Sequence, residues 1–146
     1  MTTYESDIKT ISSSEEVVFG ILSDMNNLQK YQHLIPENDK IKNLKFDADS
    51  CSFVVEMFGK VGFRIVEREP FKAIKLASEN APYEINVWIQ LKQAAENDTR
   101  LKLTLKAELP MMIKMMVDKK LKKGINTIAD MLAKALSKTP TQVVNL

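Results

Sequence analysis

Two long stretches of the sequence alternate between apolar and polar residues, and this alternation constrains the fold more than any other feature. The inward set consists of Tyr83, Ile85, Val87, Ile89 and Leu91, then Leu101, Leu103, Leu105, Ala107 and Leu109. The residues between them are polar, apart from Trp88. Successive side chains of a strand point to opposite faces. The pattern therefore predicts two antiparallel strands with one face on the core and one in water.

The same period of two extends upstream to residue 41, with interruptions at residues that favour turns. The predicted reversals are Gly59-Lys60, Glu69-Pro70-Phe71, Asn80-Ala81-Pro82 and Glu96-Asn97-Asp98. A first strand is predicted over residues 4–11, with Tyr4, Ser6 and Ile8 on one face. Because short connections favour neighbouring hairpins, the sequence indicates an antiparallel sheet of about seven strands.

Two short helices are predicted after the first strand. Ser13 and Glu16 have the spacing of a capping box, which predicts a helix from Ser13 to about Asp24. Asn26-Asn27 can cap a second helix over residues 28–34. Pro36 is expected to end it, because proline disfavours a helical residue before it.

A long amphipathic helix is predicted to follow Pro110 and to run to about Ser137, before a loose tail from residue 139. Its lysines Lys119, Lys122, Lys123 and Lys134 lie opposite an apolar stripe about 120° wide. The stripe contains Ile113, Val117, Leu121, Gly124, Ile125, Ile128, Met131, Leu132 and Ala135. At ~1.5 Å per residue, such a helix is about 40 Å long, enough to cross the whole sheet.

Length and composition predict one globular domain spanning residues 1–146, located in the cytoplasm. Hydrophobic residues make up 45% and charged residues 27%, as in ordinary soluble proteins. The four glycines argue against a glycine-rich phosphate loop. Acidic residues occupy the start of the chain, where a secretory signal would be basic and then apolar, and no apolar run approaches the roughly 18 residues of a membrane span. The single cysteine, Cys51, cannot form an internal disulfide.

The net charge of +2 is unevenly distributed along the chain. Residues 1–60 contain six basic and ten acidic side chains, whereas residues 61–146 contain fifteen and nine. A solvated face of the long helix explains most of this asymmetry. The same face could make transient contact with an anionic membrane. Nucleic-acid binding is not expected, because the aromatic residues do not interleave with the basic ones.

The order of elements resembles that of the START-like (SRPBCC) superfamily, which includes plant pathogenesis-related allergens and polyketide cyclase/dehydrase-like proteins. The resemblance rests on residues 4–11 followed by residues 13–24 at the start, and on residues 105–112 with their helix at the end. It covers nearly the whole chain, in pattern rather than in fixed residues. It implies an α+β helix-grip fold, in which a curved antiparallel sheet grips the C-terminal helix around a cavity for lipids, sterols or polyketides.

This resemblance implies that a small apolar ligand would contact the inward strand residues and the start of the long helix. The inward candidates are Phe53, Val55, Met57, Phe63, Ile65, Ile85 and Val87. They could equally pack solidly against the helix. Met112 and Met116 belong to a cluster with Met111 and Met115, and such flexible side chains either adapt to apolar partners or fill gaps in a core.

Three polar residues are candidates for contact with the ligand. Glu67 continues the inward phase of its strand and could lie at the cavity rim, although it could also be wet at the strand end. Tyr83 could place its hydroxyl at the cavity mouth or be a half-buried core residue. His33 could shuttle a proton if it faces the entrance. A lone histidine cannot form a multi-histidine site, so no metal or other cofactor is expected.

Binding or carrying a small hydrophobic ligand, without catalysis, is the predicted function. One alternative is an enzyme of the cyclase, dehydrase or hydrolase type, which would use the same cavity and its polar residues for proton transfer. It lacks a convergent acid–base pair. Another alternative is a co-chaperone-like interaction module, or a homodimer, that uses the outer sheet face around Trp88.

Overall fold

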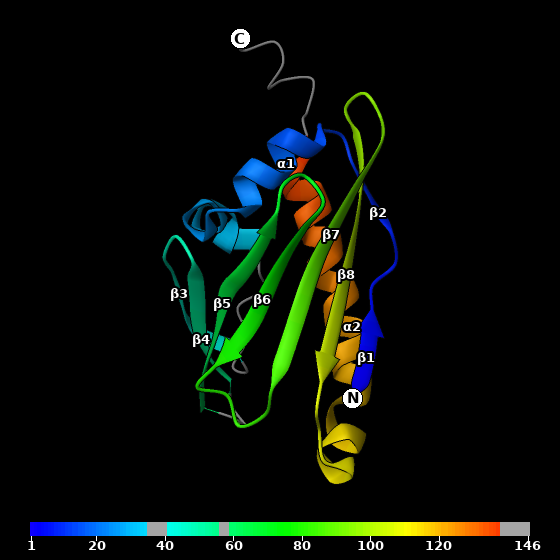
Figure 1. Ribbon diagram of the computed structural model, residues 1–146. Coiled ribbons are helices and arrows are strands. Elements are labelled where there is room, and N and C mark those ends of the chain that lie inside the picture. Colours follow the sequence, from blue (N-terminus) through cyan, green and yellow to red (C-terminus); the bar gives the residue numbers. More distant parts are fainter. Residues whose placement is uncertain (35–40, 56–58, 138–146) are drawn as a thin grey trace.

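The structure is a computed structural model that describes residues 1–34, 41–55 and 59–137, with the backbone alone for residues 32–34 and 41. It has an α+β fold, in which a curved antiparallel sheet of eight strands carries its helices on one side (Figure 1). The strands are β1 (Thr2–Glu5), β2 (Lys9–Ile11), β3 (Ile41–Phe46), β4 (Ser50–Val55), β5 (Gly59–Glu69), β6 (Ala73–Glu79), β7 (Ile85–Ala95) and β8 (Asp98–Ala107). The helices are α1 (Glu15–Leu22), the 3-10 helix η1 (Met25–Leu34) and α2 (Met111–Leu136).

The sheet follows the order β1-β8-β7-β6-β5-β4-β3, and β2 also pairs with β8. The long helix α2 packs across the sheet behind β8 (Figure 1). These features confirm the predicted α+β helix-grip fold. The predicted turns at Asn80 and Asn97 are confirmed, and these residues adopt left-handed backbone conformations with φ of 55° and 53°. The turn predicted at Gly59-Lys60 is not placed there, because both residues already pair with β4 as the start of β5; Gly59 has φ of 75°. Glycine and asparagine tolerate this conformation best.

The predicted first strand is interrupted between β1 and β2. Ser6 donates its backbone N–H to the Leu103 carbonyl at 2.9 Å, and its hydroxyl oxygen accepts the Leu103 N–H at 2.9 Å. Asp7 turns its N–H toward α2 instead and donates it to Asn126 Oδ1 at 2.7 Å. The interruption leaves Ile8 exposed whereas Tyr4 and Ser6 are buried, so its predicted position on the same face as these two residues is wrong. It also explains why the sheet has eight strands rather than seven.

Helix α1 begins one residue later than predicted. Its N-cap is Ser14, whose hydroxyl oxygen accepts the Val17 N–H at 3.3 Å. Ser13 is buried, and its hydroxyl donates to the Leu136 carbonyl at 2.7 Å. The Ser13 carbonyl accepts from Thr99 Oγ1 at 2.6 Å. Ser13 therefore joins the start of α1 to β8 and to the last turn of α2, and does not cap a helix.

Replacing Ser13 with alanine is expected to lower the free energy of unfolding by about 1–2 kcal/mol, because the buried Leu136 carbonyl loses its donor. Urea denaturation measures the change. Ser12→Ala is the matched control, because Ser12 is exposed, and its expected effect is within about 0.5 kcal/mol. Equal losses in the two variants would show that the Ser13 hydroxyl does not hold α2 in place.

The closed core lies at the end of the sheet that α1 and the C-terminal half of α2 cover, the upper end in Figure 1. Ile74 and Leu101 are among its fully buried side chains. Helix α2 contributes Ala129 and Ala133, whereas Ile128, a member of the predicted stripe, is 51% exposed. Small side chains at a contact allow a helix to approach its neighbours closely. The buried stripe is therefore rotated toward the alanines.

Candidate ligand-binding site

The concave face of the sheet is closed at one end and incompletely covered at the other. On β8, Leu101 is 0% exposed, whereas Leu105 on the same face is half-buried. Strand β7 shows the same change, from buried Ile89 to half-buried Val87 and Ile85. Residues two or four apart on a strand share a face. The cover over this face is therefore incomplete at Val87 and Leu105, although two neighbours of Leu105 are buried: Tyr4, its partner on β1, and Ala107, the next residue of this face on β8.

The half-buried zone continues across the sheet to β4 and β5. The rings of Phe53 and Phe63 stack there, with centroids 6.2 Å apart and planes inclined by 22°. We define the apolar wall as the six half-buried side chains of this zone: Phe53, Val55, Phe63, Ile85, Val87 and Leu105. None of the six has a hydrogen-bonding group. The wall can therefore hold a partner only by hydrophobic contact.

Five members of this wall are predicted site residues, and the sixth, Leu105, was missed. Leu105 shares the phase of Leu101 and Leu103, so the alternation alone could have identified it. The predicted Ile65 is buried in the closed core instead of the wall. Met57 lies outside the described residues. His33 is described by its backbone alone, at the end of η1, so its predicted role stays a prediction.

Glu67 does not face the apolar wall. The pairing of β5 with β6 shifts register after Ile65, which places Glu67 directly opposite Lys75. The Lys75 Nζ lies 5.1 Å from the centroid of the Trp88 ring, on the outer face of the sheet. Because directly paired residues share a face, Glu67 also belongs to the outer face. Glu67 is exposed, as the alternative of a wet carboxylate predicts, and its inward position is wrong because the β-bulge reverses the phase of the strand.

A buried tyrosine ties α2 to β1 beside the wall. The Tyr4 hydroxyl donates to Asp118 Oδ1 at 2.8 Å, and Lys122 Nζ lies 3.2 Å from Asp118 Oδ2. Burial, and then the bond to Asp118, raise the pKa of Tyr4 to about 12. The hydrogen bonds from Tyr4 and Lys122 lower the pKa of Asp118. This tether fixes α2 about two turns after its start.

The tether predicts how stability depends on pH above neutrality. The pKa of Tyr4 is about 12 in the folded chain and 10.0 ordinarily, so its contribution is complete below pH 10 and is lost as the pH rises through 12. Wild-type protein should therefore lose more unfolding free energy between pH 9 and pH 12 than Tyr4→Phe. Denaturation at both pH values measures the difference. Parallel losses in wild type and Tyr4→Phe would contradict the tether.

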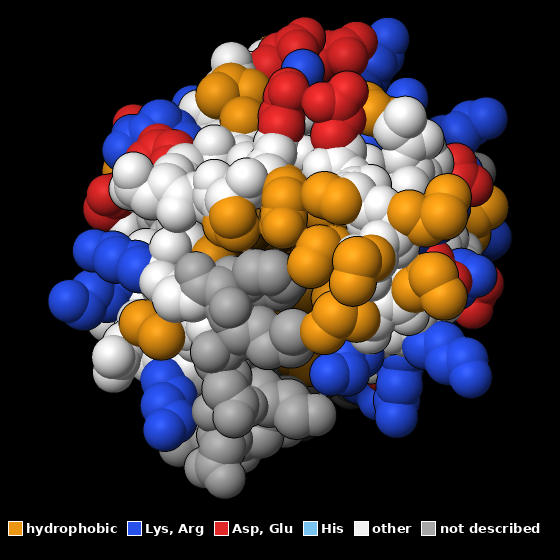
Figure 2. Space-filling model, turned by 90° about the horizontal axis from the view of Figure 1, so that it is seen from below, with side chains coloured by type: hydrophobic (Ala, Val, Ile, Leu, Met, Phe, Trp, Pro, Cys, Tyr) orange, Lys and Arg blue, Asp and Glu red, His pale blue; other side chains and the backbone are white. Residues whose placement is uncertain are grey.

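The four methionines at the start of α2 are exposed. Their exposed fractions are 76% for Met111, 78% for Met112, 77% for Met115 and 53% for Met116. Figure 2, the view from below, shows hydrophobic side chains gathered at this end of the molecule. The interpretation of these methionines as fillers of core gaps is therefore wrong. Met112 and Met116, both predicted ligand contacts, lie on the exposed surface of the helix start.

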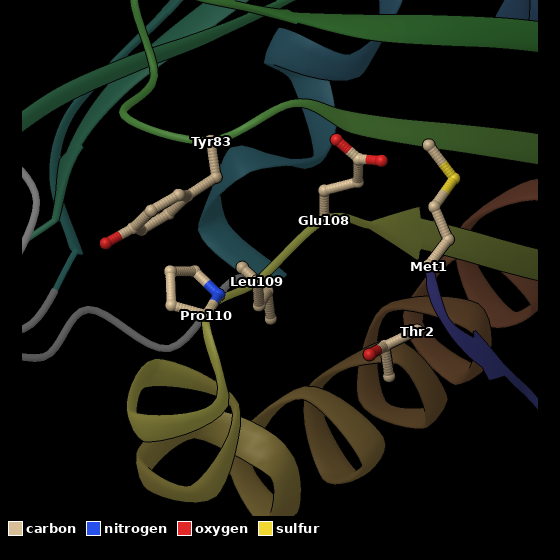
Figure 3. Close-up of a pocket in the computed structure, with 6 residues that line it drawn as sticks. All are labelled: Met1, Thr2, Tyr83, Glu108, Leu109 and Pro110. Atoms are coloured by element: carbon tan, nitrogen blue, oxygen red, sulfur yellow. The ribbon is translucent and has the colours of Figure 1, made fainter.

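A pocket of about 440 Å³ opens at the same end of the molecule (Figure 3). It lies between the start of β1, the turn before β7 and the link from β8 to α2. Its lining residues are Met1, Thr2, Tyr83, Glu108, Leu109 and Pro110. Tyr83 and Pro110 form one side, and Met1 and Thr2 form the other (Figure 3). The volume is within the range of small-molecule sites, about 300–1,000 Å³.

Among the predicted site residues whose side chains the structure describes, only Tyr83 lines this pocket. The pairing of Thr2 with Ala107 brings the beginning of the chain beside the end of β8. Local sequence carries no signal of this pairing, so Met1 and Thr2 were missed. Leu109 and Pro110 could have been found, because the alternation ends at the first and the helix begins after the second.

The outer face of the sheet carries Trp88, as the alternation predicts. Lys75 and Lys106 hold their ammonium groups 5.1 and 5.5 Å from the centroid of its ring. Cations over an aromatic face are attracted by the ring quadrupole. The lysine stems also cover part of the ring. Trp88 is consequently half-buried.

Three further observations bear on chemistry at this site. Within residues 1–34, 41–55 and 59–137, no group of three or more His, Cys, Asp or Glu side chains could hold a metal ion. Of the helices that the structure describes, none is long and apolar enough to cross a membrane. Burial raises the pKa of the Cys51 thiol to about 11, so it is protonated at neutral pH and a poor nucleophile.

The fold resembles several solved structures. Protein CV1439 from Chromobacterium violaceum is 19% identical with a TM-score of 0.64, and the match covers 95% of this chain and 100% of that one. A START superfamily protein from Mycobacterium smegmatis is 14% identical with a TM-score of 0.60, over 92% and 96% of the two chains. Norcoclaurine synthase from Thalictrum flavum is 12% identical with a TM-score of 0.68, over 92% and 86%. At these identities the likeness shows the fold alone.

The sequence also matches a protein family. No functionally curated protein is significantly similar to the chain. The CoxG family, described as a carbon monoxide dehydrogenase subunit, matches residues 9–139, from β2 to beyond the end of α2. Together with the START superfamily neighbour, this match confirms the resemblance to the START-like (SRPBCC) superfamily. The chain belongs to the CoxG family of carbon monoxide dehydrogenase subunits.

Proposed function

We propose that this protein binds a small hydrophobic molecule between the apolar wall and α2. The proposal rests on the change in burial along the concave face. Leu101 and Ile89 are buried, whereas Leu105 and Val87 on the same face and the same strands are half-buried. Half-buried apolar side chains beside a closed core leave apolar surface for a partner to cover.

Hydrophobic contact alone can supply the affinity. Burying roughly 300 Å² of apolar ligand surface at about 25 cal/mol per Å² gives about 7 kcal/mol before the costs of association. Micromolar binding then needs no charged contact. The wall has aromatic rings on one side and branched aliphatic chains on the other, which suits a ligand with a flat or branched apolar body.

The positions of the polar candidate residues favour a binding role over an enzymatic role. Glu67 lies on the outer face, and Tyr83 lines the pocket at the end of the sheet. General acid–base catalysis needs both groups within reach of one substrate. Norcoclaurine synthase, a structural neighbour, carries an enzyme's name, and the START superfamily neighbour does not. The shared fold is compatible with both ligand binding and catalysis, so it does not distinguish between them.

Native mass spectrometry of the purified protein tests the proposal. A co-purifying apolar adduct is expected, and it should be lost after extraction with organic solvent. The extracted protein should then bind the apolar fluorophore N-phenyl-1-naphthylamine at one site per chain, with a Kd in the micromolar range. Absence of both an adduct and saturable probe binding would refute a hydrophobic guest.

A second candidate role is contact with another protein through the outer sheet face. It is favoured by Trp88, which alternates with the concave-face residues Val87 and Ile89 and so lies on the other face of the sheet. Because the family is described as a subunit of carbon monoxide dehydrogenase, we propose that enzyme as the partner, or a second copy of this chain. Trp88→Ala should weaken association with the purified enzyme, or shift a dimer toward monomer in sedimentation. Tyr83→Ala, in the turn before β7, is the control.

The cytoplasm is the compartment that we propose. Cys51 is the only cysteine of the chain and is a half-buried thiol. A lone thiol suits a reducing compartment. Fractionation of cells that express the protein tests this location.

A further inference from the structure

Helix α2 contains a glycine that the fold of the protein does not require. Gly124 lies near the middle of this helix, where glycine is a poorer helix former than alanine. Its backbone does not adopt the left-handed conformation that Gly59 adopts. A Cβ atom built on Gly124 would meet no atom of the described residues within 4 Å, apart from its chain neighbours and the backbone of its own helix. Neither its conformation nor the packing of the described chain therefore explains this glycine.

The i,i+4 rows of α2 show the direction in which Gly124 faces. The row that packs on the sheet is buried or half-buried and consists of Val117, Leu121, Ile125, Ala129 and Ala133. At about 100° per residue, the residues that follow these form a second row on one side. Asp118 of the second row accepts the Tyr4 hydroxyl of β1. Asn126 of the same row accepts the N–H of Asp7, which links β1 to β2. The second row therefore faces the β1 edge of the sheet.

Gly124 belongs to a third row, which faces the opposite way. This row precedes the packed row by one residue at each turn and contains Lys120, Gly124, Ile128 and Leu132. On the side of β8 away from β1, the sheet continues into β7, β6 and β5. The third row therefore looks across the concave face toward those strands. Ile128 is 51% exposed, so this flank of α2 is largely uncovered beside Gly124.

The tether between β1 and α2 places Gly124 beside the apolar wall. Tyr4, which bonds Asp118, pairs with Leu105 on β8. Gly124 lies about two turns further along the helix. At this level of the sheet, Leu105 and its partner Val87 on β7 are half-buried. The uncovered flank of α2 and the apolar wall therefore border the same space.

We propose that Gly124 is a notch in the ligand site, and that it sets the width of the guest that the site accepts. The inference rests on the proposed function. The widest part of the guest would lie between Gly124 and the side chains of Val87 and Leu105, with Ile128 against its side. A position without a Cβ lets a ligand approach the backbone closely. Glycine at this position thus lowers the stability of the helix and leaves space for the guest.

A hinge in α2 is the alternative explanation, since helices can kink at glycine. Helix α2 is continuous from Met111 to Leu136. Asp118 before Gly124 and Asn126 after it hold the helix to the same edge of the sheet. These contacts favour a notch over a hinge. The two explanations also differ in their effect on binding, because a notch discriminates guests by width, whereas a hinge affects all guests alike.

Thermal unfolding tests whether the space at Gly124 is open. Gly124→Ala should raise the Tm by about 2–4 °C, because alanine is the better helix former and its methyl group meets no described neighbour. Gly20→Ala is the matched control, since Gly20 lies in α1 and a Cβ there also has no described atom within 4 Å. Its Tm should rise as well. A fall in Tm for Gly124→Ala alone would mean that the protein's own atoms fill the space, and would overturn the notch.

Two probes of different width test what the space is for. N-phenyl-1-naphthylamine carries two aromatic ring systems, whereas cis-parinaric acid is an unbranched chain. Wild type should bind both with a micromolar Kd. Gly124→Ala should raise the Kd of N-phenyl-1-naphthylamine about tenfold and that of cis-parinaric acid less than about twofold, because one added carbon in a fitted pocket discriminates at about this level. Gly124→Leu should widen the difference. Gly20→Ala and Gly20→Leu should leave both Kd values unchanged.

The results separate the notch from the proposed function. If wild type binds both probes and neither Kd changes in Gly124→Ala or Gly124→Leu, the notch is wrong and the ligand site stands. Equal weakening of both probes would assign Gly124 to a hinge instead. If wild type binds neither probe saturably, the hydrophobic guest is refuted and the notch with it. A ratio of the two Kd values that rises with side-chain size at residue 124, but not at residue 20, supports the notch.

Discussion

Leu101→Ala is expected to lower the free energy of unfolding by about 3 kcal/mol, because Leu101 is fully buried in the closed core and its truncation leaves a cavity. Leu105→Ala, on the same strand and the same face, should cost only about 1 kcal/mol. The half-buried Leu105 side chain loses little contact when it is truncated. Urea denaturation of both variants measures the two losses.

The comparison between these two leucines tests whether the concave face is unevenly covered. Both substitutions remove the same atoms from the same strand, so differences in helix or strand propensity cancel. Equal losses would mean that Leu105 lies in a packed core. The apolar wall would then be filled by the protein's own side chains, with no room for a ligand.

Val87→Asp is expected to weaken binding of N-phenyl-1-naphthylamine by about a hundredfold, which corresponds to about 3 kcal/mol. Val87 is half-buried in the centre of the apolar wall. An aspartate there can stay hydrated in the empty protein, but an apolar ligand would have to strip that water from the carboxylate. Fluorescence titration of the probe measures both affinities.

Asn86→Asp is the control for this variant. Asn86 precedes Val87 on β7, so its side chain points to the outer face, and the substitution adds the same charge. Probe binding should be within about twofold of wild type. If Asn86→Asp and Val87→Asp weaken binding equally, the probe does not lie against the wall. Thermal unfolding of both variants checks that each is folded.

The architecture could be predicted from the sequence because its strongest signals are local. Alternation over residues 83–109 defines the β7–β8 hairpin, and the apolar stripe after Pro110 defines α2. The same alternation correctly assigns Val87 to the concave face and Trp88 to the outer face. Hairpins and amphipathic helices carry their own patterns, so no knowledge of distant contacts is needed.

Features that depend on distant partners could not be predicted in the same way. Ser13 has the sequence context of a helix N-cap, but its hydroxyl donates a hydrogen bond to the Leu136 carbonyl, 123 residues further along the chain. Glu67 continues an unbroken alternation in the sequence, and only the pairing with Lys75 shows the bulge. The exposure of the wall depends on where α2 crosses the sheet. The sequence predicts an apolar stripe of α2 centred on Ile128, whereas Ala129 and Ala133 are the residues that are buried against the core.

The most direct test of a hydrophobic site is to locate a bound probe by NMR. Intermolecular nuclear Overhauser effects from N-phenyl-1-naphthylamine to the methyl groups of Ile85, Val87 and Leu105 are expected. Val54 should show none, since it alternates with Val55 on β4 and faces the other side of the sheet. Contacts confined to Val54 and other outer-face methyl groups, or no saturable contacts at all, would contradict a ligand site between the apolar wall and α2.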